Sequence, residues 1–153
     1  MLNNYYLSPN DWLNITIRLC FALLVGAIIG LERQLQHKPA GLRTHMLVCF
    51  GSAIFTLIPL LTGAAHPSPD SVGRVIQGIV TGVGFLGAGE IVRETPQERA
   101  RAEIHGLTSA AAIWVSAALG IACGCGLWQL GLIGTLLSLL VLKFFKTGER
   151  SDR

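Results

Sequence analysis

The sequence predicts an all-α membrane protein, a polytopic bundle of five transmembrane helices that forms one transmembrane domain over residues 1–153. Strongly apolar residues make up 51% of the chain, and charged residues make up 14%, against about 25% in an ordinary soluble domain. A chain of 153 residues could not hide that much apolar surface from water. The apolar residues also gather in stretches of about 17–25 residues, the length that a helix needs to cross a bilayer.

The five expected helices differ in how well each one suits a bilayer. The first contains Arg18 and the third contains Arg74, whereas the fifth has no charge between Leu127 and Leu142. The second and fourth are short, so tilted or partly re-entrant segments are the alternative at those two places. The expected helix ranges are 12–31, 44–61, 72–92, 107–123 and 127–145.

Basic residues predict the orientation of the bundle. Ten of the 12 Lys and Arg residues fall on one side of a five-span topology, in two connections and in the carboxyl-terminal tail. Because positive charge marks the cytoplasmic side, the amino terminus is expected outside and the carboxyl terminus in the cytoplasm. No cleavable signal peptide is expected, since the first eleven residues lack a basic region.

The first four helices are predicted to form a parallel repeat of two helix pairs. Arg18 is followed eight residues later by Gly26, and Arg74 is followed eight residues later by Gly82. The second and fourth helices both open with a Gly-Leu pair. The alternative is chance similarity between glycine-rich membrane helices.

Glycines at helical spacing predict where the helices pack. In lipid, helices associate by close backbone approach, which small residues allow. The patterns place the first, third and fourth helices in a tight centre, with the Leu-rich fifth facing lipid or a partner. Gly82→Leu or Gly87→Leu is therefore expected to disrupt folding far more than Leu136→Ala. The predicted packing glycines are Gly26, Gly30, Gly78, Gly82, Gly84, Gly87, Gly89, Gly120 and Gly124.

Two groups of polar residues are candidates for function, because an ionisable side chain inside a membrane is costly. One is an inner-face polar cluster, in which Glu32 and Arg43 are expected to lie in direct contact. The other lies below the outer surface, where it either lines an outer vestibule or snorkels to the interface. The inner-face cluster comprises Glu32, Arg33, Arg43, Thr44, His45, Glu90, Arg93 and Thr108, and the outer group comprises Arg18, Arg74 and Gln77.

The sequence carries no signature of an enzyme, a metal site or nucleic-acid binding. It lacks a phosphate-binding loop with Lys, a nucleophile elbow and an HExxH motif, so no catalytic residue and no cofactor is expected. Magnesium needs several oxygen ligands, and only Glu32 and Glu90 are deep enough to be considered, so no metal site is expected. The net charge of +3 is too small and too scattered to indicate nucleic-acid binding.

Several motifs occur together along the chain. Residues 26–33 contain Gly-x-x-x-Gly-Leu-Glu-Arg, and residues 38–45 are Lys-Pro-Ala-Gly-Leu-Arg-Thr-His. The second half has Gly-Val-Gly-Phe-Leu-Gly-Ala-Gly at 82–89 and Gly-Leu-Thr-Ser-Ala-Ala at 106–111. In combination these motifs resemble the MgtC/SapB family of bacterial inner-membrane proteins, from about Arg18 to Phe145.

The resemblance implies a place in the bacterial inner membrane and links to magnesium limitation, virulence and modulation of the membrane ATP synthase. A magnesium-transport role has also been suggested for the family. The chain departs from the family pattern in two ways, and these limit which family properties can be expected of it. The member that gives the family its name has a soluble carboxyl-terminal domain, whereas this chain stops eight residues after Phe145. Family members also usually have an apolar residue where Glu90 stands.

Two functions follow as hypotheses. The first is a regulatory or stress-adaptation protein that acts through helix contacts in the lipid bilayer, with a larger membrane complex or with itself as a homo-oligomer. The faces of small residues favour it. The alternative is a small ion transporter or channel, for magnesium among other ions, which the intramembrane residues Arg18, Arg74, Gln77 and Glu90 favour.

Overall fold

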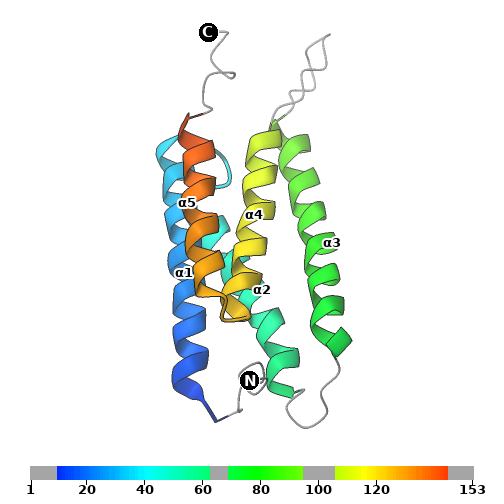
Figure 1. Cartoon of the computed structure of the whole chain (residues 1–153). Coiled ribbons are helices and arrows are strands. Elements are labelled where there is room, and N and C mark those ends of the chain that lie inside the picture. The colour runs from blue at the N-terminus through cyan, green and yellow to red at the C-terminus, as the bar shows by residue number, and fades with distance from the viewer. Residues whose placement is uncertain (1–9, 63–68, 95–105, 145–153) are drawn as a thin grey trace, which may run out of the picture.

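A computed structural model describes residues 10–62, 69–94 and 106–144, and over these ranges it confirms an all-α bundle without strands. The chain alternates in direction from each helix to the next, so helices adjacent in sequence are antiparallel (Figure 1). The five helices are α1 (Trp12–Leu35), α2 (Leu42–Thr62), α3 (Pro69–Glu94), α4 (Leu107–Gly124) and α5 (Trp128–Phe144).

Among the described residues, α1 to α4 are long and apolar enough to cross a membrane. α2 and α4 are each one continuous helix, of 21 and 18 residues, which disfavours the re-entrant alternative. α5 has 17 residues, at the lower limit of spanning length, although its sequence is the least interrupted of the five. Asp11 begins α1, because its side chain accepts a hydrogen bond from the Asn14 backbone N–H.

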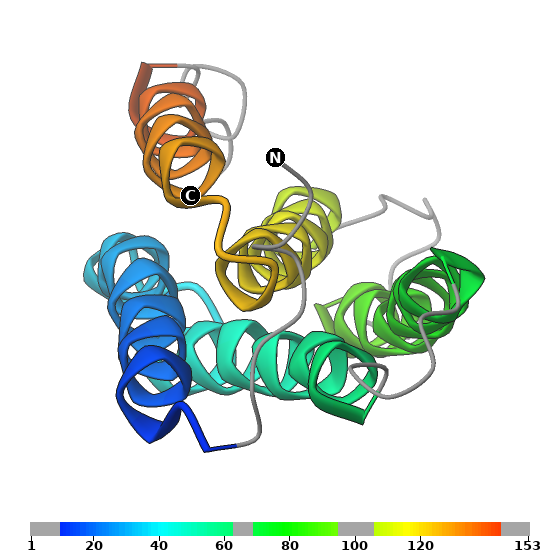
Figure 2. The ribbon, with the colours of Figure 1, turned by 60° about the horizontal axis from the view of Figure 1, so that its bottom comes forward.

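Three helices, α1, α2 and α4, pack closely, and α3 and α5 lie at the edges of this group (Figure 2). Within the described residues, α3 contacts α2 and α4 but not α1, and α5 contacts α1 and α4 but not α2. Only 6% of the spanning residues of α3 are buried, against 56% in α4. Most of the surface of α3 is therefore open to whatever surrounds the bundle.

Two glycines bring α1 against the backbone of α2. A Cβ atom on Gly26 would lie 2.6 Å from the His45 carbonyl oxygen, and a Cβ atom on Gly30 would lie 2.7 Å from Leu42 Cα. Real Cβ atoms essentially never come this close to other heavy atoms. Glycine is thus required at both positions for this helix pair.

Two further glycines bring α4 against the other side of α2. A Cβ atom on Gly120 would collide with the backbone of Cys49, its carbonyl oxygen first. A Cβ atom on Gly124 would lie 2.9 Å from the Ala53 carbonyl oxygen. The helix at the middle of the tight centre is therefore α2, held between glycine faces of α1 and α4.

The glycines of α3 correct the predicted packing. A Cβ atom on Gly87 would make an ordinary 3.5 Å contact with Ala110 Cβ on α4. The prediction that α3 belongs to the tight centre does not hold, and Gly82→Leu is no longer expected to disrupt folding. The sequence shows that a helix face is small but not which neighbour lies against it. A Cβ atom would meet nothing within 4 Å at Gly78, Gly82, Gly84 and Gly89.

The predicted repeat of helix pairs stays a prediction. In both pairs a glycine of the first helix contacts the same position in the second helix, namely its fourth residue. Gly30 lies beside His45 in the α1–α2 pair, and Gly87 lies beside Ala110 in the α3–α4 pair. This shared contact agrees with a repeat, although the α1–α2 contact is much closer.

Candidate functional site

Two charged side chains are buried where α1 ends, at what we call the Glu32 end of the bundle. Glu32 is 8% exposed and Arg33 is 4% exposed. Arg33 Nε donates a hydrogen bond to Glu32 Oε2 at 2.8 Å, which makes this contact an ion pair. Within the described ranges, Glu32 Oε1 and Arg33 Nη1 have no hydrogen-bond partner. The pair therefore keeps one free acceptor and one free donor away from water.

His45 lies fully buried beside this ion pair, close enough to interact electrostatically with both charges. Its Nε2 lies 3.2 Å from the Ala40 carbonyl oxygen, which can only accept, so Nε2 is the donor there. In the neutral ring Nδ1 then accepts a hydrogen bond from the Ser116 hydroxyl at 2.8 Å. One turn further along α2, the Cys49 thiol donates to the Ser116 carbonyl oxygen at 2.9 Å. These contacts join α4 to the beginning of α2.

The remaining members of the predicted inner-face cluster are more dispersed. Arg43 is exposed and makes no ion pair with Glu32 among the described residues, so the expected direct contact between them is wrong. Arg33 is adjacent to Glu32 in sequence and shares its buried environment, whereas Arg43 is exposed. Thr44 and Glu90 are half-buried and Thr108 is exposed, while the Arg93 side chain lies outside the described residues.

Arg18 is the buried member of the predicted outer group. It is 7% exposed, and its Nη1 donates to the Gly124 carbonyl oxygen at 2.8 Å. Its Nε donates to Asn14 Oδ1 at 2.9 Å, one turn earlier on α1. Arg74 and Gln77 are exposed on α3, which does not touch α1 within the described residues, so the three do not form a vestibule there.

Arg18 caps the carboxyl-terminal end of α4. That end carries unpaired carbonyl groups and a partial negative charge, both of which favour a cation. Gly126, in the turn to α5, has a φ of 74° and lies so close that a Cβ atom there would be 2.8 Å from Arg18 Cζ. In the same turn, burial raises the pKa of the Cys125 thiol, and the Arg18 guanidinium opposes this shift. No motif in the sequence pointed to this cap, because its partners are 106 residues apart.

Arg18→Met should lower the free energy of unfolding by about 2 kcal/mol, since it removes charged hydrogen bonds to two partly enclosed oxygen atoms. Arg18→Lys should recover part of the loss, because it keeps the charge but not the two-pronged geometry. Denaturant titration of the purified protein in mild detergent measures both. Arg43→Met, which removes an exposed arginine, is the matched control and should change little. Equal stability of Arg18→Met and Arg43→Met would contradict the capping role.

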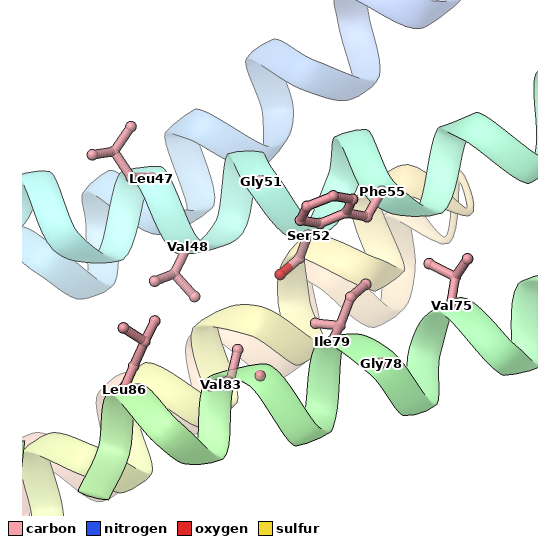
Figure 3. Close-up of a pocket in the computed structure, with 11 residues that line it drawn as sticks. Leu47, Val48, Gly51, Ser52, Phe55, Val75, Gly78, Ile79, Val83 and Leu86 are labelled. Carbon is pink, nitrogen blue, oxygen red and sulfur yellow. The ribbon is translucent and has the colours of Figure 1, made fainter. Parts of the chain in front are cut away.

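An apolar groove of about 680 Å³ lies between α2 and α3. Side chains of the two helices point toward one another across it, with Val48 and Ser52 on α2 and Ile79 and Leu86 on α3 (Figure 3). Ser52 is the one lining residue with a polar side chain. The full lining is Leu47, Val48, Gly51, Ser52, Phe55, Val75, Gly78, Ile79, Gly82, Val83 and Leu86.

The groove lies at the middle of the membrane-spanning helices. Its lining covers residues 47–55 within the α2 span of 42–62 and residues 75–86 within the α3 span of 70–92. Glycines form part of both walls, and a Cβ atom on Gly51, Gly78 or Gly82 would meet nothing within 4 Å. Backbone is therefore accessible from the groove at mid-membrane depth.

Comparison with known proteins identifies the family. The sequence model described as the MgtC family matches residues 19–151, most of the chain. The chain belongs to the MgtC family. None of the solved structures matches the chain significantly.

Three relatives illustrate the family. Protein SrpB of Synechococcus elongatus is 47% identical over 97% of this chain and 84% of its own length. An Escherichia coli K12 protein named "Putative magnesium transporter YhiD" is 44% identical over 84% of this chain, and Protein MgtC of Salmonella typhimurium is 44% identical over 80%. The matches cover 59% of YhiD and 48% of MgtC, so the chain spans about half the length of these two relatives.

The structure of this MgtC family member offers several candidate features but no metal cage within its described residues. In the part of the chain that the structure describes, no three His, Cys, Asp or Glu side chains gather closely enough to hold a metal ion. The features that the structure adds are the buried Glu32–Arg33 pair with His45, the Arg18 cap, and the groove between α2 and α3. Of these, the groove is the feature that faces outward.

Proposed function

We propose that this MgtC family protein is a regulatory protein of the bacterial inner membrane, linked to magnesium limitation. It acts by binding a transmembrane helix of a larger membrane complex in the groove between α2 and α3. The complex that the family resemblance suggests is the membrane ATP synthase. With the orientation expected from the basic residues, the Glu32 end of the bundle faces the cytoplasm.

The position of the groove at mid-membrane depth carries this proposal. An acyl chain enters from one leaflet and ends near the middle of the bilayer, whereas a transmembrane helix passes through the whole depth. A groove centred in two spanning helices suits a helix better than a lipid tail. Accessible backbone at Gly51, Gly78 and Gly82 favours close helix approach, the way helices associate in lipid.

A second candidate function is ion transport, and the Glu32–Arg33 pair is the observation that favours it. A buried carboxylate oxygen and a buried guanidinium nitrogen without partners are typical of sites on an ion or proton pathway. The name that YhiD carries points the same way. Magnesium flux into proteoliposomes, wild type against Glu32→Gln, would support this function only if the wild type conducts and the variant does not.

The helix-binding proposal predicts a position-dependent photocross-link. A photoreactive amino acid at Phe55, which lines the groove, should form an adduct with a membrane subunit of the ATP synthase in native membranes. The same group at Leu137, which is 57% exposed on α5, is the control and should not form this adduct. Lipid adducts alone at Phe55, or the same protein adducts at both positions, would overturn the proposal.

A further inference from the structure

The outer face of α3 carries polar residues in a regular pattern. Asp70, Arg74, Gln77, Thr81, Gly84 and Ala88 follow one another at separations of four, three, four, three and four residues. This is the heptad spacing that places residues along one seam of a helix. All six are exposed, and none of them lines the groove between α2 and α3. We call this face the α3 seam.

Three polar side chains of the α3 seam lack partners within the described residues. Asp70 and Arg74 form no ion pair there, and the Gln77 side chain forms no hydrogen bond. By the rise of a helix, Gln77 lies about 10 Å deeper in the membrane than Asp70. A carboxamide facing lipid at that depth is costly unless another polar group meets it. The seam is therefore poorly suited to lipid, even though it lies on the outside of the chain.

We propose that the α3 seam binds the α3 seam of a second copy of this chain in a symmetric dimer. All copies insert in the same direction, so the symmetry axis lies along the membrane normal and residues of equal depth meet. Under that symmetry, polar groups of the seam can pair with polar groups of the same seam in the second copy. A carboxamide both donates and accepts, so Gln77 can pair with the Gln77 of the second copy.

Charge complementarity at one end of the seam supports a second copy rather than an unrelated helix. Asp70 and Arg74 are one turn apart, at adjacent positions of the seam. At equal depth Asp70 faces Asp70 and Arg74 faces Arg74 of the second copy, and each long Arg74 side chain can reach one turn along to Asp70 of the other copy, so two equivalent ion pairs form. Deeper in the membrane, Gly84 and Ala88 allow the two backbones to approach. Thr81 already donates to the Gln77 carbonyl oxygen at 2.9 Å, so its hydroxyl needs no further acceptor.

The test is the dimer fraction in liposomes, measured by energy transfer between labelled copies as the protein-to-lipid ratio is raised. Gln77→Leu should weaken the dimer about tenfold, because it removes two hydrogen bonds of the membrane interior. Asp70→Arg and Arg74→Asp should each weaken it, and the double exchange Asp70→Arg/Arg74→Asp should restore it. Gly82→Ala, which changes the groove and not the seam, is the matched control and should leave the dimer fraction unchanged.

Two results would overturn the proposal. One is a wild-type protein that stays monomeric at every protein-to-lipid ratio. The other is a dimer that survives Gln77→Leu and both single charge exchanges, since that dimer would use another face. Helical content of each variant is measured alongside, and it should not change, because all six seam residues are exposed. Binding of an ATP synthase helix in the groove is tested by a different experiment, the photocross-link at Phe55. Failure of one proposal therefore leaves the other unaffected.

Discussion

Gly120→Ala is expected to lower the free energy of unfolding by about 3 kcal/mol or more, and Gly120→Leu to prevent recovery of folded protein. The added Cβ atom would collide with the Cys49 carbonyl oxygen and Cα in the middle of α2. Backbone cannot move aside as a flexible side chain can, and extra atoms in a close-packed interior typically cost 1–3 kcal/mol or more. Denaturant titration in mild detergent measures the alanine variant, and the yield of monodisperse protein measures the leucine variant.

Gly82→Ala and Gly82→Leu are the matched controls, because Gly82 is also a helical glycine but faces open space. Both should fold with nearly wild-type stability. Equal responses at Gly120 and Gly82 would show that α2 is not the helix held between glycine faces.

Arg33→Met is expected to cost about 3–5 kcal/mol, because it leaves the buried Glu32 carboxylate without its partner. The double variant Glu32→Met/Arg33→Met should recover most of that loss, since replacing a whole buried ion pair by apolar residues is often nearly neutral. The same denaturant titration measures both. Arg43→Met is the exposed control and should be close to wild type. Additive losses in the double variant would show that the two charges act independently.

The sequence predicted the helices better than their packing. Apolar length and charge distribution fixed the fold class, because a bilayer imposes both directly. α1 continues to Leu35 and α3 begins at Pro69, beyond the expected ends. The apolar stretches used to predict these ends stop at the first charged residues, whereas the helical hydrogen bonds continue past them.

Packing partners could not be predicted, because a small face on one helix fits a small face on any other. Gly26 and Gly82 have the same local pattern, yet one lies against α2 and the other faces open space. Glu32, Arg33 and His45 belong to the predicted inner-face cluster, and the structure brings these three together. The choice of Arg33 over Arg43 as the partner of Glu32 depends on which side chains the neighbouring helices bury, which sequence spacing does not contain.

The rate of ATP-driven proton pumping tests most directly whether the protein acts through its groove. Inverted membrane vesicles that contain the wild-type protein should pump protons at a different rate from vesicles without it. Gly82→Trp, which fills the groove, should return the rate to that of vesicles without the protein, and Leu137→Trp on α5 should change the rate as the wild type does. Equal rates with the wild type and with Gly82→Trp, or a wild type that leaves the rate unchanged, would contradict binding through the groove.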